Sequence, residues 1–599
     1  MNPLALHYKG QFGIIKLIMA EGGSQKVMQN VLKMWKTLWH QKKGGGARFF
    51  QVFPWVWLIA AYCITFAVLA LYGRPYIDSD MASEMVLANL LKEEGGILSV
   101  NWWYSTEIEF CALPVFYEVG LSFFPTNWYA ARIMGQAIAM LLLLLSYLYV
   151  GHGLKLKNSG VWGAAALACP FGVWYFWYGA FGGLYLMYMI WQLMSFGAIL
   201  HLLFASKKRA YVLHGLLLAA SCFLSGLNSV KGIMGFYLPM LLAACLIFLL
   251  KWNNKPQQLP ERGKRLLIWS VVAALLACIG YLINGTFLAK NHLFKSYNGQ
   301  EWVQLSFSQL LDKWAEFLSL FGHPGDGFLK DKIPLFSAIG LLGSFSLLTI
   351  FAIIVSTVRL LWRWKELNTS QLIAPVLLVW ICIVQGIAFS CTGVPSSINA
   401  SYWLTAVPFV FPVLQLEGET EHFSLKFTRK LAAIAFSCCF VATSIGATMQ
   451  FFSSGYRINP HLETICDWLV GQGYTQGYAT FWNGNVLTEW SNGQIEMWVT
   501  EDFNDMEMHQ WLQKSSHQQP PEGQVFLITT QEELEKMGLS QLYWWSNVVY
   551  EDDSSQWLSK VGHYLVMTYK NYDDMMNAIH GAQSWEQEAA QETQDTQSA

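Results

Sequence analysis

The sequence predicts an α-helical polytopic membrane protein of about eleven transmembrane helices, followed by a small extracytoplasmic α/β domain. Of the 599 residues, 54% are hydrophobic and 13% are charged, whereas soluble proteins carry about 25% charged residues. The apolar residues fall into runs of roughly 20, the length at which a helix crosses a bilayer. Residues 455–599 hold 5 Lys/Arg against 21 Asp/Glu, a net charge of −16, and the preceding residues hold 33 against 19, a net of +14. This composition excludes a disordered chain and most soluble enzymes.

The N-terminal segment 1–48 is predicted to be cytoplasmic. Residues 24–43 place Met34 and Leu38 on one helical face and lysines on the other. A basic amphipathic helix of this kind lies on an anionic membrane surface. Gly44 to Gly46 then separate it from the first span.

The membrane domain is predicted over 49–452. A further apolar stretch, 109–125, contains Glu109, Glu118 and Pro114, so we interpret it as an outer-surface or re-entrant helix. The eleven predicted spans are roughly 49–72, 127–150, 160–178, 181–204, 210–228, 232–250, 266–289, 334–357, 371–391, 401–416 and 430–452.

The distribution of positive charge sets the predicted sidedness. With the N-terminus inside and eleven spans, the cytoplasmic segments hold 24 of the 38 Lys/Arg. Cytoplasmic loops carry such an excess in membrane proteins. The acidic C-terminal part then lies outside, as do two long loops at 73–126 and 290–333. We expect chemistry or recognition on this outer face because long ordered loops are usually functional.

The C-terminal part is predicted to be a small α/β domain over 453–581. Residues 462–470 have a helical pattern, and the strands are expected at 477–481, 494–499, 524–529 and 563–569. The stretch 582–599 is rich in Gln, Glu and Ala and is predicted to be a disordered acidic tail. The net charge of −16 on residues 455–599 argues against binding of nucleic acid, because phosphate contacts need Lys and Arg.

Two aspartates follow the first span directly. Asp78 and Asp80 form a D-x-D tripeptide, and a helix is expected after them because apolar residues recur at helical spacing until Gly95 and Gly96. Asp80 and Glu84, four residues apart, share one face of that helix, which we expect to lie flat at the membrane surface. One interpretation is structural, since Asp78 or its neighbour can cap the helix. The other is catalytic.

The placement of this motif resembles that in the GT-C superfamily of membrane glycosyltransferases. This superfamily includes the protein O-mannosyltransferases, the aminoarabinose transferases of lipid A and the oligosaccharyltransferase catalytic subunits. The resemblance rests on an acidic motif after span one, a surface helix, an aromatic apolar stretch and Arg132 entering span two. It covers about 49–452. The stretch 477–485 (GYATFWNGN) also looks like one in uncharacterised bacterial membrane proteins of this type.

The resemblance implies a polyprenyl-phosphate-linked sugar donor, a cell-envelope glycan or protein acceptor, and a multi-pass protein of the plasma membrane. Asp78 and Asp80 match the family's acidic motif, in which one acid is the general base on the acceptor. In the oligosaccharyltransferase group the acids bind a divalent cation instead, so a metal at Asp78 and Asp80 stays open. A positioned carboxylate makes a hydroxyl nucleophilic by taking its proton.

A lipid phosphate leaving group needs cationic partners. The candidates are Arg132, at the outer end of span two, and Lys231, in a tight turn. Snorkelling to the interface and a solvated turn are the respective structural alternatives. Lys290, Lys295 and His323 of the second long loop are weaker candidates. The outer aromatic residues, from Trp102 to Trp302, fit an interfacial belt better than a sugar-stacking surface.

Two other functions remain compatible with the sequence. One is a transporter or flippase for lipid-linked glycans, although the span centres lack the ionisable groups that ion coupling needs. The other is a non-catalytic GT-C relative that serves as a binding or assembly subunit. The sequence does not name the sugar or the acceptor.

Overall fold

The computed structural model describes residues 45–105, 108–252, 259–295, 302–322, 334–391, 401–419, 440–449, 451–452, 460–551 and 564–598. The chain divides into two units, Met1–Ala60 and Ala61–Ala599. The described part of the first unit is the start of helix α3 (Gly45–Tyr72), and the predicted amphipathic helix at 24–43 lies outside the described residues.

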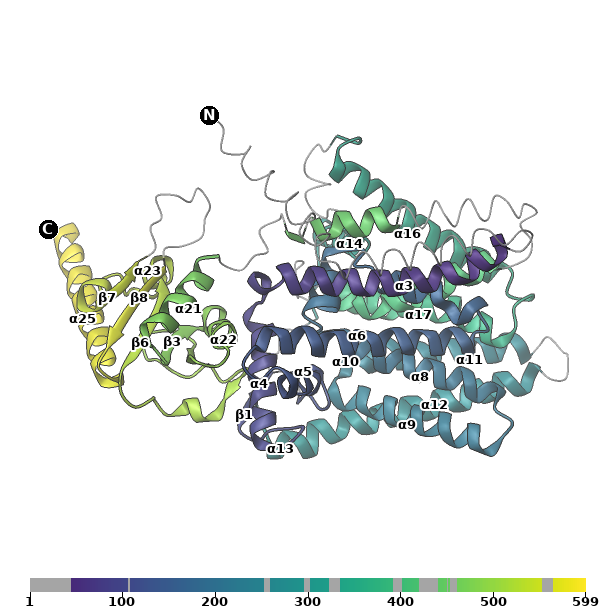
Figure 1. Ribbon diagram of the computed structural model, residues 1–599, viewed down its shortest axis with the longest axis horizontal. Helices are drawn as coiled ribbons and strands as arrows, with labels where there is room; N and C mark the ends of the chain where they lie inside the picture. Colours follow the sequence, from purple (N-terminus) through teal and green to yellow (C-terminus); the bar gives the residue numbers. More distant parts are fainter. Residues whose placement is uncertain are drawn as a thin grey trace, which may run out of the picture. The chain divides into compact units, whose positions relative to one another are not determined.

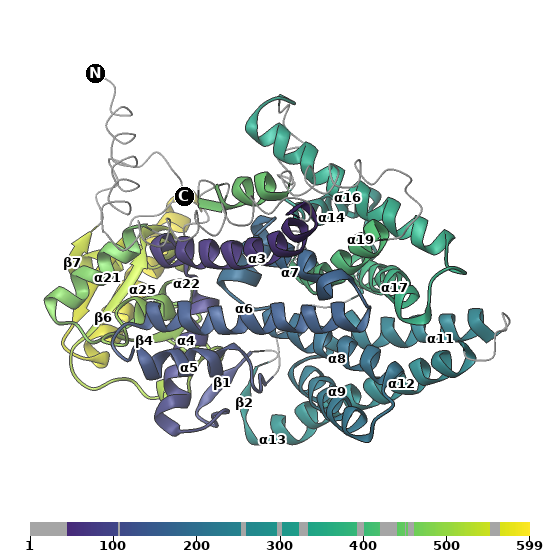
Figure 2. The same ribbon diagram turned by 45° about the vertical axis from the view of Figure 1, so that its right-hand side comes forward.

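Among the described residues, eight helical segments are long and apolar enough to cross a membrane, which supports a multi-pass membrane protein. Within the second unit, α6, α8, α9, α12 and α11 pack side by side in that order (Figures 1 and 2). The eight segments are α3, α6 (Trp128–Gly153), α8 (Leu186–Phe204), α9 (Lys208–Asn228), α10–η4–α11 (Val230–Gly232, Ile233–Tyr237, Leu238–Trp252), α12–η5–α13 (Leu259–Ile283, Asn284–Leu288, Ala289–Asn291), α16 (Ala338–Trp362) and α17 (Thr369–Cys391).

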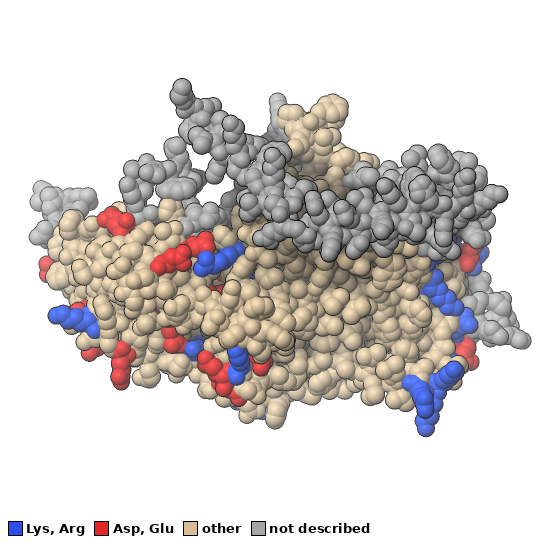
Figure 3. Space-filling model, in the orientation of Figure 1, with Lys and Arg blue, Asp and Glu red and all other residues tan. Residues whose placement is uncertain are grey.

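Charged side chains are sparse on the face over these helices. Figure 3 shows a broad face with almost no Lys, Arg, Asp or Glu, bordered by charged residues at its two ends. Leu213, Leu216 and Leu275 are among the large apolar side chains that this helical part exposes. An uncharged apolar surface of this kind is what a bilayer solvates.

Two predicted spans differ from the structure, and a third lies partly outside the described residues. The segment at 160–178 is interrupted: α7 (Val161–Leu167) ends before Pro170, and a π-helix, η3 (Tyr175–Phe181), follows. Proline disfavours a continuing helix and restricts the residue before it. The segment at 401–416 is a short 3₁₀-helix, η6 (Trp403–Phe409), leading into α19 (Val410–Glu419). Of 430–452, only 440–449 and 451–452 are described, so the count of eleven stays a prediction.

The segment 73–126, predicted to be the first outer loop, is built of short elements. They are η1 (Arg74–Tyr76), α4 (Ser79–Glu94), β1 (Trp102–Tyr104) and α5 (Leu113–Phe123). Eleven residues of helix extend only about 16 Å, so α5 is too short to cross a bilayer of about 30 Å. Helix α4 ends at Gly95, whose φ of 68° is easy only for glycine. Helix α4 packs against α5 and against a helix of the C-terminal domain, α22 (Phe481–Trp490).

The C-terminal domain has a five-stranded sheet in the order β4-β3-β6-β8-β7. Strands β4 (Glu496–Thr500), β3 (Gln476–Thr480) and β6 (Val525–Thr530) are parallel, and β8 (Tyr564–Tyr569) and β7 (Asn547–Glu551) complete it antiparallel. The four predicted strands are all present. Helices α21 (Pro460–Gln472), α22 (Phe481–Trp490), α23 (Gln531–Met537), α24 (Leu542–Trp545) and α25 (Tyr572–Ser598) accompany the sheet.

The predicted disorder from 582 onward differs from the structure. Helix α25 continues to Ser598, and Ala582 is fully buried in the domain core. Ala, Gln and Glu are strong helix formers, so the composition that suggested disorder also extends a helix once its first turns are packed.

A second, small sheet joins three distant segments of the chain. Strand β2 (Leu293–Phe294) pairs parallel with β1, and β5 (Gln513–Lys514) pairs antiparallel with β1 on its other edge. The first outer loop, the second outer loop and the C-terminal domain therefore meet in one hydrogen-bonded unit.

Candidate functional site

Asp78 begins α4. Its side-chain Oδ1 accepts a hydrogen bond from the Met81 backbone N–H at 2.8 Å, so Asp78 is the N-cap of the helix. The residue is 4% exposed. Burial raises the pKa of Asp78 to about 6, and Glu489 adds to this while the Met81 hydrogen bond and Arg132 oppose it. Asp78 therefore has the helix-capping role that the sequence allowed as its structural interpretation.

Arg132 is fully buried and paired with an acid of the C-terminal domain. Its Nε donates to Glu489 Oε1 and its Nη2 to Glu489 Oε2, both at 2.6 Å. The same guanidinium donates to Tyr117 Oη at 3.0 Å and to the Met81 carbonyl at 2.6 Å. One side chain of α6 thus holds α4, α5 and α22 together. Four of the five guanidinium N–H groups are used in these contacts.

Asp80 lies in the first turn of α4, next to the cap. It is partly exposed, and its side chain makes no hydrogen bond to another described residue. Burial raises the pKa of Asp80 to about 7, and the charge of Asp78 adds to this rise. A carboxyl group that titrates near neutral pH is suited to general acid–base chemistry.

Glu84 follows one turn later on the same face of α4. It shares a hydrogen bond with Glu109, which follows residues 106–107, outside the described ranges. Burial, and then the neighbouring Glu109, raise the pKa of Glu84 well above its usual range, although Arg132 opposes the shift. Two carboxyl groups can share a hydrogen bond only when one of them is protonated.

Lys231 lies over three tyrosine rings. Ser229 caps the short helix α10, and its Oγ accepts from the Lys231 backbone N–H at 3.0 Å. The Lys231 Nζ lies 5.9, 5.9 and 5.7 Å from the ring centroids of Tyr185, Tyr188 and Tyr402. Cation–π attraction of this kind holds an ammonium group in place without neutralising its charge.

Tyr185 lies beside the Lys231 ammonium, whose Nζ is 5.9 Å from the centroid of the tyrosine ring. Burial raises the pKa of the Tyr185 phenol, the Lys231 ammonium opposes the shift, and Asp80 adds to it.

A small cavity lies beside this group. It has a volume of about 20 Å³ and is lined by Glu84, Glu109, Tyr188, Trp191 and Asn228, among others. That volume holds about one water molecule. The Trp191 indole N–H and Glu84 Oε2 are buried without a hydrogen-bond partner.

The described residues do not fit a protein-ligated metal ion at Asp78 and Asp80. No group of three or more His, Cys, Asp or Glu in the described ranges is arranged to hold one. One Asp78 oxygen is already committed to capping α4. Hard divalent cations need several oxygen ligands, so we derive no step through a metal.

The remaining predicted candidates lie elsewhere. Lys295 Nζ pairs with Glu501 at 2.5 Å, Lys290 lines a separate open pocket, and His323 lies outside the described residues. Several of the predicted interfacial aromatics are instead buried in the protein: Trp102, Tyr104, Trp128 and Tyr175 are at most 5% exposed.

Sequence reasoning missed Glu489 and the tyrosines around Lys231. Glu489 is the one acidic residue in the ten residues of α22, which was a usable signal, because a lone buried acid needs a partner. Nothing in the sequence connects it to Arg132, 357 positions away.

Comparison with known proteins found no matching family model and no matching curated protein. Among solved structures, the chain is similar to the apo oligosaccharyltransferase of Archaeoglobus fulgidus, at 14% identity over 88% of this chain and 78% of that chain, with a TM-score of 0.43. A complex of this enzyme with zinc and sulfate matches at 13% identity over 81% and 69%, with a TM-score of 0.43. The arabinofuranosyltransferase AftD from mycobacteria matches at 12% identity over 86% and 40%, with a TM-score of 0.36. These names belong to sugar-transferring enzymes, but likenesses at this level carry no argument for function.

Proposed function

We propose that this protein transfers a sugar from a polyprenyl-phosphate-linked donor to an acceptor hydroxyl at the outer face of a membrane. One observation carries the proposal: Asp80 lies in the first turn of the helix that follows the span ending at Tyr72, and Lys231 lies in the first turn of the span that begins at Val230. Asp80 supplies a base that titrates near neutral pH, and Lys231 supplies a fixed positive charge. Transfer from a lipid-linked phosphate donor needs a base for the acceptor proton and a cation for the leaving phosphate.

In the proposed step the acceptor oxygen attacks the anomeric carbon of the donor sugar. The bond between that carbon and the phosphate oxygen breaks, and its electron pair leaves with the polyprenyl phosphate. The acceptor proton passes to Asp80. The Lys231 ammonium stabilises the negative charge that develops on the leaving phosphate.

The other two predicted site residues have supporting parts in this proposal. Asp78 fixes the start of α4 and, by its charge, raises the pKa of Asp80. Arg132 uses most of its donors on Glu489, Tyr117 and the Met81 carbonyl. We therefore assign phosphate binding to Lys231, and to Arg132 the positioning of α4.

The test uses the full-length protein in lipid nanodiscs with a panel of undecaprenyl-phosphate hexoses. The measurement is the release of undecaprenyl phosphate, with and without added acceptor. Asp80→Asn should lower the rate by about 10²–10⁴-fold, the usual effect of removing a general base. Asp573→Asn is the matched control, because Asp573 is an exposed aspartate in the first turn of α25. If Asp80→Asn keeps the full rate on every donor that the unmodified protein uses, the proposed base is wrong. If the unmodified protein turns over none of them, and the protein in sealed liposomes moves the lipid across the bilayer, the flippase alternative is supported instead.

A further inference from the structure

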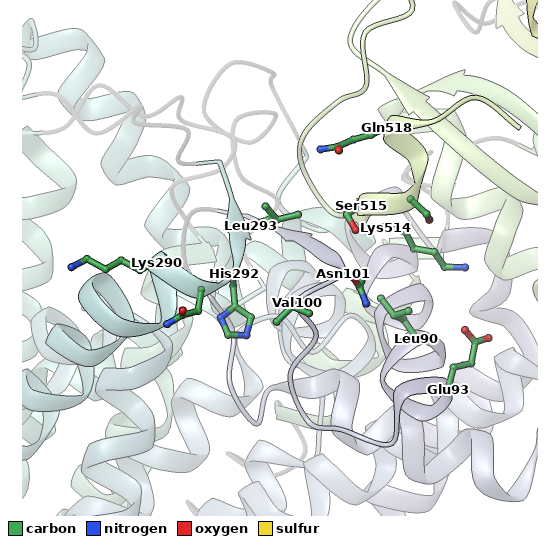
Figure 4. Close-up of a pocket in the computed structure, with 12 residues that line it drawn as sticks. Leu90, Glu93, Val100, Asn101, Lys290, His292, Leu293, Lys514, Ser515 and Gln518 are labelled. Carbon is green, nitrogen blue, oxygen red and sulfur yellow. The ribbon is translucent and has the colours of Figure 1, made fainter.

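A second, larger pocket lies on the small sheet and is separate from the Asp80 site. It is open, has a volume of about 820 Å³, and takes its lining from four segments of the chain. Figure 4 shows Leu90 and Glu93 from α4, Asn101 from the loop before β1, His292 from the turn before β2, and Lys514, Ser515 and Gln518 from the C-terminal domain. The volume is in the range of sites that hold small organic ligands.

We propose that this pocket binds the acceptor, and that the acceptor is a glycan chain; the inference rests on the function proposed above. The polar lining combines hydroxyl and amide side chains with ammonium groups: Asn101, Asn291, Lys514, Ser515, Ser516 and Gln518. Hydroxyl and amide groups both donate and accept hydrogen bonds. Sugar hydroxyls do the same, so this lining matches a polyhydroxylated ligand.

The apolar part of the lining is shallow. Leu90, Val100 and Leu293 contribute side chains, and Val100 is 56% exposed. Such a floor contacts the C–H faces of sugar rings but does not enclose an apolar side chain. A peptide acceptor would need deeper apolar pockets for its side chains.

The pocket is held in shape before any ligand arrives. The Ser515 backbone N–H donates to the Asn101 carbonyl at 2.9 Å, and the Leu512 N–H donates to the Trp103 carbonyl at 2.8 Å. The Asn101 Nδ2 donates to Glu94 Oε1 at 2.9 Å. Preorganised walls lower the ordering cost of binding.

Lys514 gives the pocket a cation in an otherwise acidic domain. Only 5 Lys/Arg lie in residues 455–599. The Lys514 Nζ donates to Glu496 Oε1 at 2.8 Å, and an ammonium group carries three donors, so further N–H groups can face a ligand. His292 lies at the opposite side of the pocket, with its ring edge-on to Tyr104 at 6.3 Å.

The pocket and the Asp80 site are connected through α4. Asp80 lies at its beginning, and Leu90 is ten residues further on, or about 15 Å along the helix axis. An extended oligosaccharide can occupy the pocket while its terminal hydroxyl reaches the reacting sugar. A single free monosaccharide cannot occupy both places at once.

The experiment measures binding and turnover separately. Full-length protein in nanodiscs is titrated with three probes: a neutral glucan hexasaccharide, a galacturonic acid hexasaccharide and a Ser/Thr-rich hexapeptide. We expect at least one hexasaccharide to bind. Ser516→Trp fills the pocket from an exposed position and should weaken that binding about tenfold or more. Ser584→Trp, on the exposed side of α25, is the matched control and should bind normally.

Turnover distinguishes this inference from the function on which it rests. In Ser516→Trp the KM for a glycan acceptor should rise, while donor hydrolysis without acceptor stays unchanged. Gln518→Ala, a smaller change at an exposed lining residue, should also weaken hexasaccharide binding and raise the acceptor KM, with donor hydrolysis unchanged, and it guards against misfolding of the tryptophan variant. Binding of the peptide alone, or hexasaccharide binding that Ser516→Trp and Gln518→Ala both leave intact, would overturn the inference. Absent donor turnover with intact saccharide binding would instead overturn the proposed function.

Discussion

The guanidinium of Arg132 and the carboxylate of Glu489 form a two-pronged ion pair, 2.6 Å at each contact, with both side chains at most 1% exposed. The pair ties a membrane-spanning helix to the sheet domain. Because Arg132 also donates to the carbonyl of Met81, it fixes the first turn of α4, in which Asp80 lies.

Glu489→Gln should destabilise the protein strongly. Removing one partner leaves the other charge buried and uncompensated, which costs about 3–5 kcal/mol. The double variant Arg132→Met with Glu489→Leu should lose less, because no charge is stranded. Thermal unfolding in nanodiscs measures both, and Glu532→Gln, which breaks the exposed pair with Lys536, should leave the midpoint unchanged. Equal losses for the single and double variants would contradict this account.

Substitutions of Asp78 and Asp80 should differ in their effect on the stability of the protein as well as on its activity. Asp78→Ala removes the N-cap bond to Met81 and should cost about 1 kcal/mol. Folding raises the pKa of Asp80 from its ordinary value of 3.8 to about 7. The ionised form is therefore disfavoured by folding, and stability is lost progressively as the pH rises from that ordinary value to about 7, above which the loss is complete. Asp80→Asn removes that loss.

The measurement is the thermal midpoint of both variants and the unmodified protein at pH 4 and pH 8. Asp80→Asn should unfold at a higher temperature than the unmodified protein at pH 8 and at a similar one at pH 4, near the ordinary aspartate pKa of 3.8. A lower midpoint for Asp80→Asn at pH 8 would show that the Asp80 carboxylate is structural.

The sequence anticipated local patterns better than long-range contacts. Alternation of apolar residues placed all four predicted strands, and Gly95 marked the end of α4, because both signals are local. Apolar run length failed at 160–178, since hydropathy does not register the break at Pro170. The Asp-x-Asp motif was found from the sequence. The different roles of Asp78, which caps α4, and Asp80, which does not, depend on the packing of α22, about 400 residues later in the chain.

The pH profile of donor turnover should identify the base. A base acts when deprotonated, so the rate should rise with pH up to about 7 and then level off, following the pKa of Asp80. The Asp78 charge raises that pKa. Asp78→Asn should therefore lower it and move the acidic limb to lower pH, whereas Asp573→Asn should leave the profile in place. An unshifted limb in Asp78→Asn would mean that another group titrates.

The proposed topology places the N-terminus in the cytoplasm and the C-terminal domain outside. A membrane-impermeant maleimide added to intact cells should label Ser584→Cys on α25 and miss Ser206→Cys, which lies between α8 and α9. Both positions are exposed, so access from solvent is matched. The unmodified protein gives the background from its own cysteines. Labelling of Ser206→Cys alone would invert the topology.

Substitution of Lys231 should affect the release of phosphate from the donor more than the binding of the acceptor. Lys231→Gln keeps most of the side-chain volume over Tyr185, Tyr188 and Tyr402 but removes the charge. We expect the rate of phosphate release to fall about 10²-fold or more, as for loss of one electrostatic contact to a developing anion. Lys231→Arg should recover part of the loss, because it restores the cation over the rings. A Lys231→Gln variant with an unchanged rate would place Lys231 outside the reaction.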